Sequence, residues 1–135
     1  MTYLVDTDII IYWLKGNSCI EQTALDVGLE NISFSIISKA ELFFGAYKST
    51  YVKQNLDSIS VLSQKIVLLP FDELAAEHFG RIKNFLRQAG IILADADIMI
   101  ASIALANNLT LITNNTKHFS RINDLKVSNW MLKEG

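Results

Sequence analysis

Short apolar runs alternate with longer amphipathic stretches along this chain. The runs are typical of buried strands, and we expect them at residues 3–6, 32–37, 66–69 and 110–113, with a possible fifth at 126–130. Between the runs, apolar spacing predicts helices over residues 8–15, 39–47, 51–63, 72–88 and 97–107. The last of these helices is apolar almost all round, which indicates burial between layers. This alternation predicts a three-layer α/β/α domain with a mainly parallel central sheet of four to five strands.

Composition bounds what this domain can be. The chain has 135 residues, of which 50% are hydrophobic, so we expect one domain over residues 1–135 and exclude intrinsic disorder. The formal net charge of −2 argues against a strongly basic nucleic-acid binder. The single cysteine, Cys19, favours a reducing compartment, and no apolar run reaches the roughly 20 residues of a membrane-spanning helix. With no targeting peptide visible, we expect a soluble, cytoplasmic protein.

Polar side chains gather where the predicted strands end. Asp6 ends the first strand, and Thr113 and Asn115 lie at the end of the fourth. Glu41 is expected in the first turn of the helix after the second strand, and Asp97 at the start of the buried helix. Ligand sites of parallel α/β sheets lie outside the carboxyl ends of the strands, so we expect these five side chains to converge at one edge.

Converging carboxylates repel one another and need a compensating charge. Oxygen ligands favour Mg²⁺ or Mn²⁺, whereas the only histidines, His78 and His118, fit no zinc-binding spacing. An oxygen-bound divalent cation with open water positions supports phosphoryl chemistry. The pattern therefore indicates hydrolysis of a phosphodiester.

Each of these residues also has a purely structural interpretation. Ser38 and Glu41 have the spacing of an S-x-x-E capping box, and Asp95 is preferred as the N-cap of the buried helix. Thr113 and Asn115 could instead cap a short helix over residues 116–119. Asp6 has the weakest alternative, since it ends a buried strand with no basic residue before Lys15.

Four sequence blocks carry a family resemblance: L-V-D-T-D at residues 4–8, S-I-I-S-K-A-E-L-F-F-G at 35–45, A-D-A-D-I-M-I-A at 94–101 and L-T-L-I-T-N-N-T-K-H-F at 109–119. With these blocks the chain resembles the PIN-domain ribonucleases and, among them, the VapC toxins of type II toxin–antitoxin modules. The blocks occur in the family's order and spacing and cover essentially the whole chain.

The resemblance implies a Mg²⁺- or Mn²⁺-dependent endoribonuclease. Asp6, Glu41 and Asp97 match the family's three acidic metal ligands. Asn115 falls where many members carry a fourth aspartate, which argues against a firmly bound second metal, and Thr113 matches a hydroxyl residue that orients the site. The resemblance also implies a structured RNA substrate such as tRNA, a small VapB-like antitoxin that covers the site, and a homodimer.

Other side chains receive supporting roles. The basic residues expected to bind the RNA backbone, or for the first three simply to form a solvated helix face, are Arg81, Lys83, Arg87, Lys117 and Arg121. His118 is assigned a surface or capping role rather than catalysis. Core or dimer contacts are expected for three aromatic residues at helical spacing, Phe43, Phe44 and Tyr47.

Two rival functions are weighed against the ribonuclease. Asp6 and Asp8 resemble the D-x-D pair of haloacid-dehalogenase-like phosphatases, but the later acidic pair of that class is missing after Thr113. A PIN-fold binding module without catalysis is disfavoured by the three intact acidic residues. Without those three, 11 acidic residues remain against 12 basic ones, so net charge does not exclude RNA.

Overall fold

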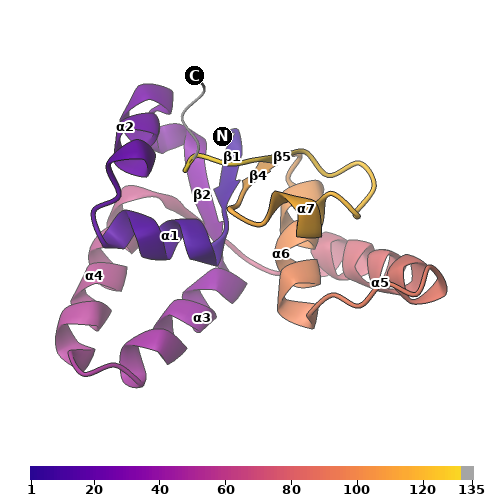
Figure 1. The fold of residues 1–135 in the computed structure, drawn as a ribbon, viewed down its shortest axis with the longest axis horizontal. Helices are drawn as coiled ribbons and strands as arrows, with labels where there is room; N and C mark the ends of the chain where they lie inside the picture. Colours follow the sequence, from indigo (N-terminus) through magenta and orange to yellow (C-terminus); the bar gives the residue numbers. More distant parts are fainter. Residues whose placement is uncertain (132–135) are drawn as a thin grey trace.

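The fold is built on one five-stranded, all-parallel sheet. The structure is a computed structural model that describes residues 1–131. The strand order is β3-β2-β1-β4-β5 and every pair is parallel, which confirms the predicted parallel α/β class. Figure 1 shows β2, β1 and β4 near the middle of the molecule, between the helices. The strands are β1 (Tyr3–Val5), β2 (Ile32–Ser35), β3 (Val67–Leu69), β4 (Thr110–Ile112) and β5 (Val127–Ser128).

Helices connect the strands, and their positions follow the apolar spacing within a few residues. They are α1 (Thr7–Leu14), α2 (Ser18–Val27), α3 (Ile36–Tyr47), α4 (Val52–Lys65), α5 (Glu73–Gln88), α6 (Asp95–Ala106) and the one-turn α7 (Thr116–Phe119), with a 3-10 turn at Leu29–Asn31. Helix α2 was not predicted, because only Ile20 and Ala24 of its residues are buried and its apolar pattern is weak. None of the helices within residues 1–131 is long and apolar enough to cross a membrane.

The sheet separates two apolar clusters, which gives the predicted three layers. Because side chains alternate along a strand, Leu4 and Leu111 face the α5–α6 side while Val5 and Ile112 face the opposite side. Helices α1, α2 and α4 cover that second face (Figure 1). Helix α6 is buried along most of its length, as its uniformly apolar sequence predicted.

The boundary between β2 and α3 differs from the prediction. The strand ends at Ser35 rather than residue 37, because the Ser35 hydroxyl accepts a hydrogen bond from the Ser38 amide at 2.9 Å and caps α3. Glu41 therefore lies in the second turn of α3, not the first. The predicted S-x-x-E capping box is wrong, since Ser35 and not Ser38 is the N-cap.

The start of α6 also corrects the sequence interpretation. Ala94 is the N-cap, and Asp95 is the first helical residue, where its Oδ1 accepts from Lys83 Nζ at 2.9 Å. Asp95 is thus paired with a neighbouring helix instead of capping its own. Gly90 follows the Ala89 C-cap of α5 and ends the helix with a φ of +72°, which favours glycine.

Strand order fixes where a site can form. The chain places β2 and β3 on one side of β1 and then returns to place β4 on the other side. A crevice forms at such a reversal of strand order, beyond the carboxyl ends of the two strands. The residues that follow β1 and β4 are therefore neighbours at the mouth of that crevice.

Candidate active site

Asp6 and Thr113 form the centre of the site. Asp6 follows β1 and caps α1, with its Oδ1 accepting from the Thr7 amide at 2.8 Å. Its Oδ2 accepts a 2.8 Å hydrogen bond from the buried hydroxyl of Thr113, which follows β4. The same hydroxyl accepts from the Asn115 amide at 3.1 Å. Parallel pairing of β1 with β4 thereby joins residues that lie 107 positions apart.

The other predicted residues line the same hollow, whose volume is about 290 Å³. Asp97 reaches it from the first turn of α6, and Glu41 from α3. The Thr7 hydroxyl donates to Glu41 Oε1 at 2.7 Å, which links α1 to α3. Asn115 lines the hollow beside them, although as N-cap of α7 it makes no side-chain capping bond. The predicted convergence of the three acidic residues and Asn115 is present.

Asp8 is a further acidic residue of this hollow that the sequence analysis left out of the site. Asp8 lies in the first turn of α1, where its Oδ1 accepts from the Ile9 amide and its Oδ2 from the Asn114 amide at 3.1 Å. The sequence marks Asp8 in the D-x-D pair and in the L-V-D-T-D block, although neither pattern assigns it to the metal site. A helix that begins at Thr7 puts both aspartates of the pair at its N-terminal end.

The site disfavours the negative charge that its side chains carry. Burial, followed by the nearby charge of Asp8, raises the pKa of Asp6 to about 7 from its ordinary 3.8. Burial likewise raises the pKa of Asp8. The charges that act on Asp6, those of Asp8 and Asp97, are both negative. A cation in the hollow would relieve this repulsion.

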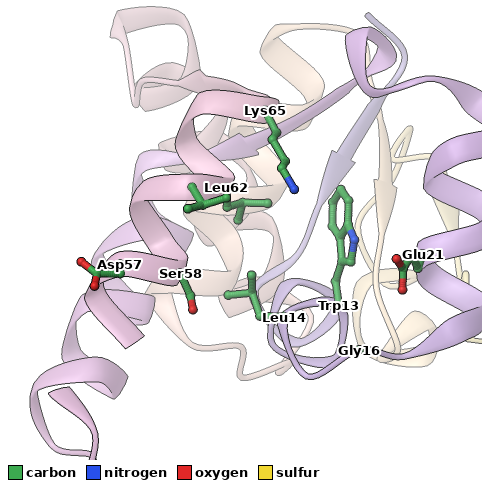
Figure 2. A pocket seen from close by; sticks show the side chains of 9 residues that line it. Trp13, Leu14, Gly16, Glu21, Asp57, Ser58, Leu62 and Lys65 are labelled. Carbon is green, nitrogen blue, oxygen red and sulfur yellow. The ribbon is translucent and has the colours of Figure 1, made fainter. Parts of the chain in front are cut away.

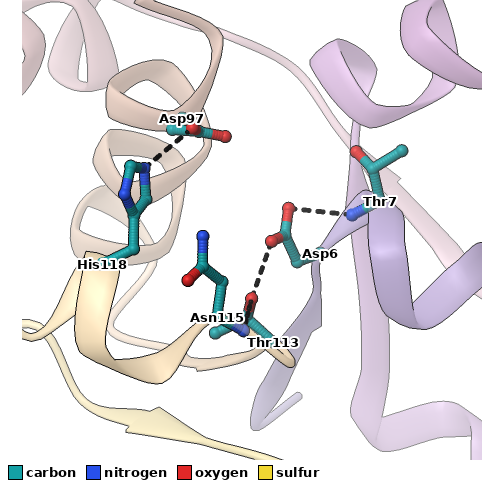
Figure 3. A network of polar contacts seen from close by, with 6 residues as sticks. All are labelled: Asp6, Thr7, Asp97, Thr113, Asn115 and His118. Carbon is teal, nitrogen blue, oxygen red and sulfur yellow. Dashed lines mark hydrogen bonds and ion pairs between the residues drawn. The ribbon is translucent and has the colours of Figure 1, made fainter. Parts of the chain in front are cut away.

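His118 lies closer to the chemistry than predicted. Its Nε2 is 3.0 Å from Asp97 Oδ2, so a residue assigned to the surface contacts a predicted ligand. Figure 3 shows the side chains of Asp6, Asp97, Asn115 and His118 around a common space, with dashed contacts to Thr113 and Thr7. His118 could not be placed from sequence, since the contact joins positions 21 residues apart.

The donor set fits a hard divalent cation. The polar side chains that line the hollow all carry oxygen atoms that can bind a cation, while Ile11 and Phe119 complete its wall. Among the acids, Asp6 is buried and Asp8 and Asp97 are half-buried. Within residues 1–131 no three histidine, cysteine, aspartate or glutamate side chains form a ready-made metal site. Mg²⁺ is compatible with this arrangement, because it keeps several waters and takes one or two carboxylates from the protein.

A larger hollow, of about 440 Å³, lies away from the strand ends, among α1, α2 and α4. Figure 2 shows Trp13 and Lys65 facing each other across it, with Glu21 and Asp57 at its rim. It contains none of the predicted site residues. Its lining has one basic and two acidic side chains, which do not form a cluster of carboxylates that could bind a cation. Its larger volume alone therefore does not make it the functional site.

The structure also places the basic residues of α5 that were expected to bind RNA and the three aromatic residues of α3. On α5, Lys83 pairs with Asp95, Arg81 contacts His78 and Arg87 contacts Asn84, all at the exposed surface. Their role in RNA binding stays a prediction. The three aromatic residues lie outside the core, since Phe43, Phe44 and Tyr47 are 38%, 68% and 67% exposed, and the alternative role as dimer contacts stays a prediction.

Fold and site together define the class of this protein: a parallel α/β domain with an acidic hollow at its strand switch point. The PIN-domain family model matches residues 3–125. Ribonuclease VapC2 of Rickettsia felis is 33% identical over 132 residues, covering 96% of this chain and 98% of the relative. The tRNA(fMet)-specific endonuclease VapC of Shigella flexneri is 30% identical over 130 residues, covering 96% and 98%.

The chain belongs to the PIN-domain family and, within it, to the VapC ribonucleases. A solved structure agrees: VapBC2 of Rickettsia felis, bound to a DNA fragment from its promoter, superposes with a TM-score of 0.90 and 33% identity over 96% of this chain and 99% of that one. The family match confirms the resemblance to the PIN-domain ribonucleases and excludes the alternative of a haloacid-dehalogenase-like phosphatase.

Proposed function

We propose that this VapC-family ribonuclease is a Mg²⁺- or Mn²⁺-dependent endoribonuclease that acts as the toxin of a type II toxin–antitoxin pair. One observation carries the proposal: Asp6, Asp8, Glu41 and Asp97 line a single hollow at the strand switch point. Four acidic side chains around one space are costly unless a cation is shared among them. Hydrolysis of a phosphodiester is the chemistry that such a cation supports.

Asp6 and Asp97 are the principal ligands in this proposal, with Glu41 binding directly or through water. When bound, the cation would supply an activated water and neutralise charge at the scissile phosphate. Thr113 orients the Asp6 carboxylate through its 2.8 Å hydrogen bond, and Thr7 does the same for Glu41 at 2.7 Å. Asn115 contributes a neutral amide at the rim, where it can hydrogen-bond the RNA backbone without repelling it.

The substrate we propose is a structured RNA, with tRNA as the first candidate. The relative from Shigella flexneri is named for tRNA(fMet), and this supports a tRNA substrate here. A net charge of −2 favours recognition by shape at a local site over tight, nonspecific binding. A cytoplasmic location belongs to the same proposal, because such substrates lie there.

The partner we propose is a small VapB-like antitoxin, with the toxin itself forming a homodimer. The related VapBC2 structure supports the antitoxin. Exposed apolar side chains also favour a protein partner, notably Ile11, which lines the hollow, and Phe44 and Tyr47 on α3.

Cleavage assays with purified protein test the proposal. We expect the wild-type chain to cut structured RNA with Mg²⁺ or Mn²⁺, with tRNA(fMet) the first substrate tried, and EDTA to stop the reaction. Asp6→Asn and Asp97→Asn should each abolish cleavage. The matched control is Asp95→Asn, two residues from Asp97 on the same helix but paired with Lys83 at the surface, and it should cut at the wild-type rate.

Growth tests address the toxin role. Expression of the wild-type chain should arrest growth. We expect a short reading frame upstream of its gene to encode the antitoxin, and coexpression of that antitoxin should relieve the arrest. If Asp6→Asn and Asp97→Asn cut RNA as fast as wild type, the metal assignment is wrong. If the folded wild-type protein binds RNA without cutting any, the binding-module alternative holds instead.

A further inference from the structure

Each acidic residue proposed to hold the cation has its own side-chain hydrogen-bond donor. Thr113 donates to Asp6 and Thr7 donates to Glu41. Asp97 has the imidazole of His118 in the corresponding position. We propose that His118 is a positioning residue that holds Asp97 in the orientation needed to bind the divalent cation, an inference that rests on the metal dependence proposed above.

The contact has the geometry of a directed hydrogen bond. His118 Nε2 lies 3.0 Å from Asp97 Oδ2 (Figure 3). An ionised carboxylate can only accept, so the proton of this bond is on Nε2. One carboxylate oxygen is thereby engaged, and Oδ1 of Asp97 is left for the hollow.

The imidazole is itself held in place by the one-turn helix that carries it. The next residue, Phe119, is 1% exposed and anchors α7 in the apolar cluster beneath α6. The rings of His118 and Phe119 pack edge to face, with centroids 5.3 Å apart. The His118 amide donates to the Asn115 carbonyl at 3.2 Å, so the turn that positions His118 also carries Asn115.

Asp97 needs such a partner more than Asp6 does. The Asp6 side chain is buried and has two donors, whereas the Asp97 side chain keeps 31% of its surface exposed. A partly exposed carboxylate without a partner samples several rotamers, and binding a cation then costs the entropy of fixing one. Outer hydrogen bonds to metal ligands are worth 10–100-fold in metal affinity in other proteins, roughly the effect expected here.

Mn²⁺ titration by calorimetry, without RNA, measures this role directly. We expect His118→Ala to raise the Mn²⁺ dissociation constant by roughly 10–100-fold over wild type. His118→Gln places an amide donor at about the same distance from the backbone as Nε2, so its constant should lie much closer to wild type. The control is His78→Ala, the same substitution on α5, where the histidine contacts Arg81 and no site carboxylate.

Cleavage rates across Mn²⁺ concentrations provide a second readout. A positioning role shifts the concentration for half-maximal rate in His118→Ala and leaves the rate at saturating Mn²⁺ near wild type. If His118 only stabilised α7, the melting temperature would fall with the dissociation constant unchanged. If it transferred a proton to the leaving group, Ala and Gln variants would both lose rate at saturating Mn²⁺. Either result overturns the proposal.

The calorimetry results distinguish a failure of the role proposed for His118 from a failure of the metal dependence on which it rests. A wild-type chain that binds Mn²⁺ no more tightly than His118→Ala contradicts the role of His118 alone. A wild-type chain that does not bind Mn²⁺ at all contradicts the proposed metal dependence, and the role of His118 with it. If His118→Ala fails to fold, the Mn²⁺ dissociation constants of wild type, His118→Gln and His118→Asn test the proposal instead. The Asn side chain is too short to reach Asp97, so this variant should bind Mn²⁺ as weakly as expected for His118→Ala.

Discussion

Thr113 and Asp6 stand at the ends of adjacent parallel strands, and the hydroxyl of Thr113 donates a 2.8 Å hydrogen bond to Asp6 Oδ2. The bond lies in the buried floor of the hollow, where water cannot replace it. It lowers the pKa of Asp6 against the larger effects of burial and of Asp8, which raise it. Thr113 therefore favours the ionised form of a buried acid whose other surroundings favour the protonated form.

Removing this donor should damage both stability and activity. Thr113→Val keeps the shape of the side chain but leaves Asp6 Oδ2 without its donor, at a cost of about 1–3 kcal/mol in the free energy of unfolding. Cleavage should fall sharply as well. Thr113→Ser keeps the hydroxyl and should lose only about 1 kcal/mol, the value of one buried methyl group. Urea denaturation measures both variants, and equal losses in Val and Ser would contradict the hydrogen-bond argument.

Asp6→Asn should stabilise the protein in EDTA, increasingly so as pH rises. With a pKa of about 7 in the folded state against 3.8 for the ordinary carboxyl, Asp6 is protonated in the folded chain and ionised in the unfolded chain between these values. Unfolding then releases a proton, so the contribution of Asp6 to stability falls as pH rises through this window and is fully lost above it. Each pKa unit is worth about 1.4 kcal/mol, which makes the loss a few kcal/mol at most.

Melting temperatures of the two proteins between pH 5 and pH 8 check this prediction. The advantage of Asp6→Asn should grow across that range in EDTA. Added Mn²⁺ should raise the melting temperature of the wild type only, because a ligand that binds the folded state stabilises it by mass action. A constant difference at all pH values would mean that Asp6 is not held in the protonated form.

Asn115→Asp tests whether the site tolerates a further charge. A carboxylate here adds repulsion on the order of 1 kcal/mol from a like charge nearby, so the variant should be less stable than wild type in EDTA. With Mn²⁺ the order should reverse, because an added anionic ligand favours cation binding. Calorimetry gives the affinity and stoichiometry. An unchanged dissociation constant would show that the side chain at 115 does not face the cation.

Thr7→Val should reduce cleavage by freeing the side chain of Glu41, while changing the stability of the fold only slightly. The Thr7 hydroxyl meets Glu41 Oε1 at the surface and also contacts the Ser38 hydroxyl at 2.9 Å, so its loss should change the free energy of unfolding by about 1 kcal/mol. Cleavage should nevertheless fall by about tenfold, the lower range for lost support of a ligand. Thr7→Ser retains the hydroxyl and serves as the control. A Val variant with full activity would remove Glu41 from the set of positioned ligands.

Much of the site could be predicted because its acidic residues stand next to apolar segments of the sequence. Asp6 ends an apolar run, and Asp97 directly precedes the apolar stretch that forms most of α6, so the sequence itself sets both against their surroundings. Asp8 was missed for a different reason. Its side chain enters the hollow only because α1 begins at Thr7, one residue earlier than predicted, and helix ends are the least certain part of any pattern.

The errors share a physical cause. Asp95 was predicted to cap its own helix, but Lys83 from α5 offers a charged partner at 2.9 Å. His118 was assigned to the surface, but the fold of α7 against α6 turns it toward Asp97. In both cases the contact joins two elements that meet only after the chain has packed, so the local sequence does not show it.

The amino-acid sequence by itself determined the layers, the parallel sheet and the edge at which the acidic residues gather, because periodicity and strand ends are local properties of the chain. Tertiary structure alone decided which side chain supports which carboxylate. Pairing of β1 with β4 brings Thr113 to Asp6, and packing of α7 brings His118 to Asp97. Those partners are 107 and 21 residues apart, and hydrogen bonds at such separations depend on the register and packing of the whole fold.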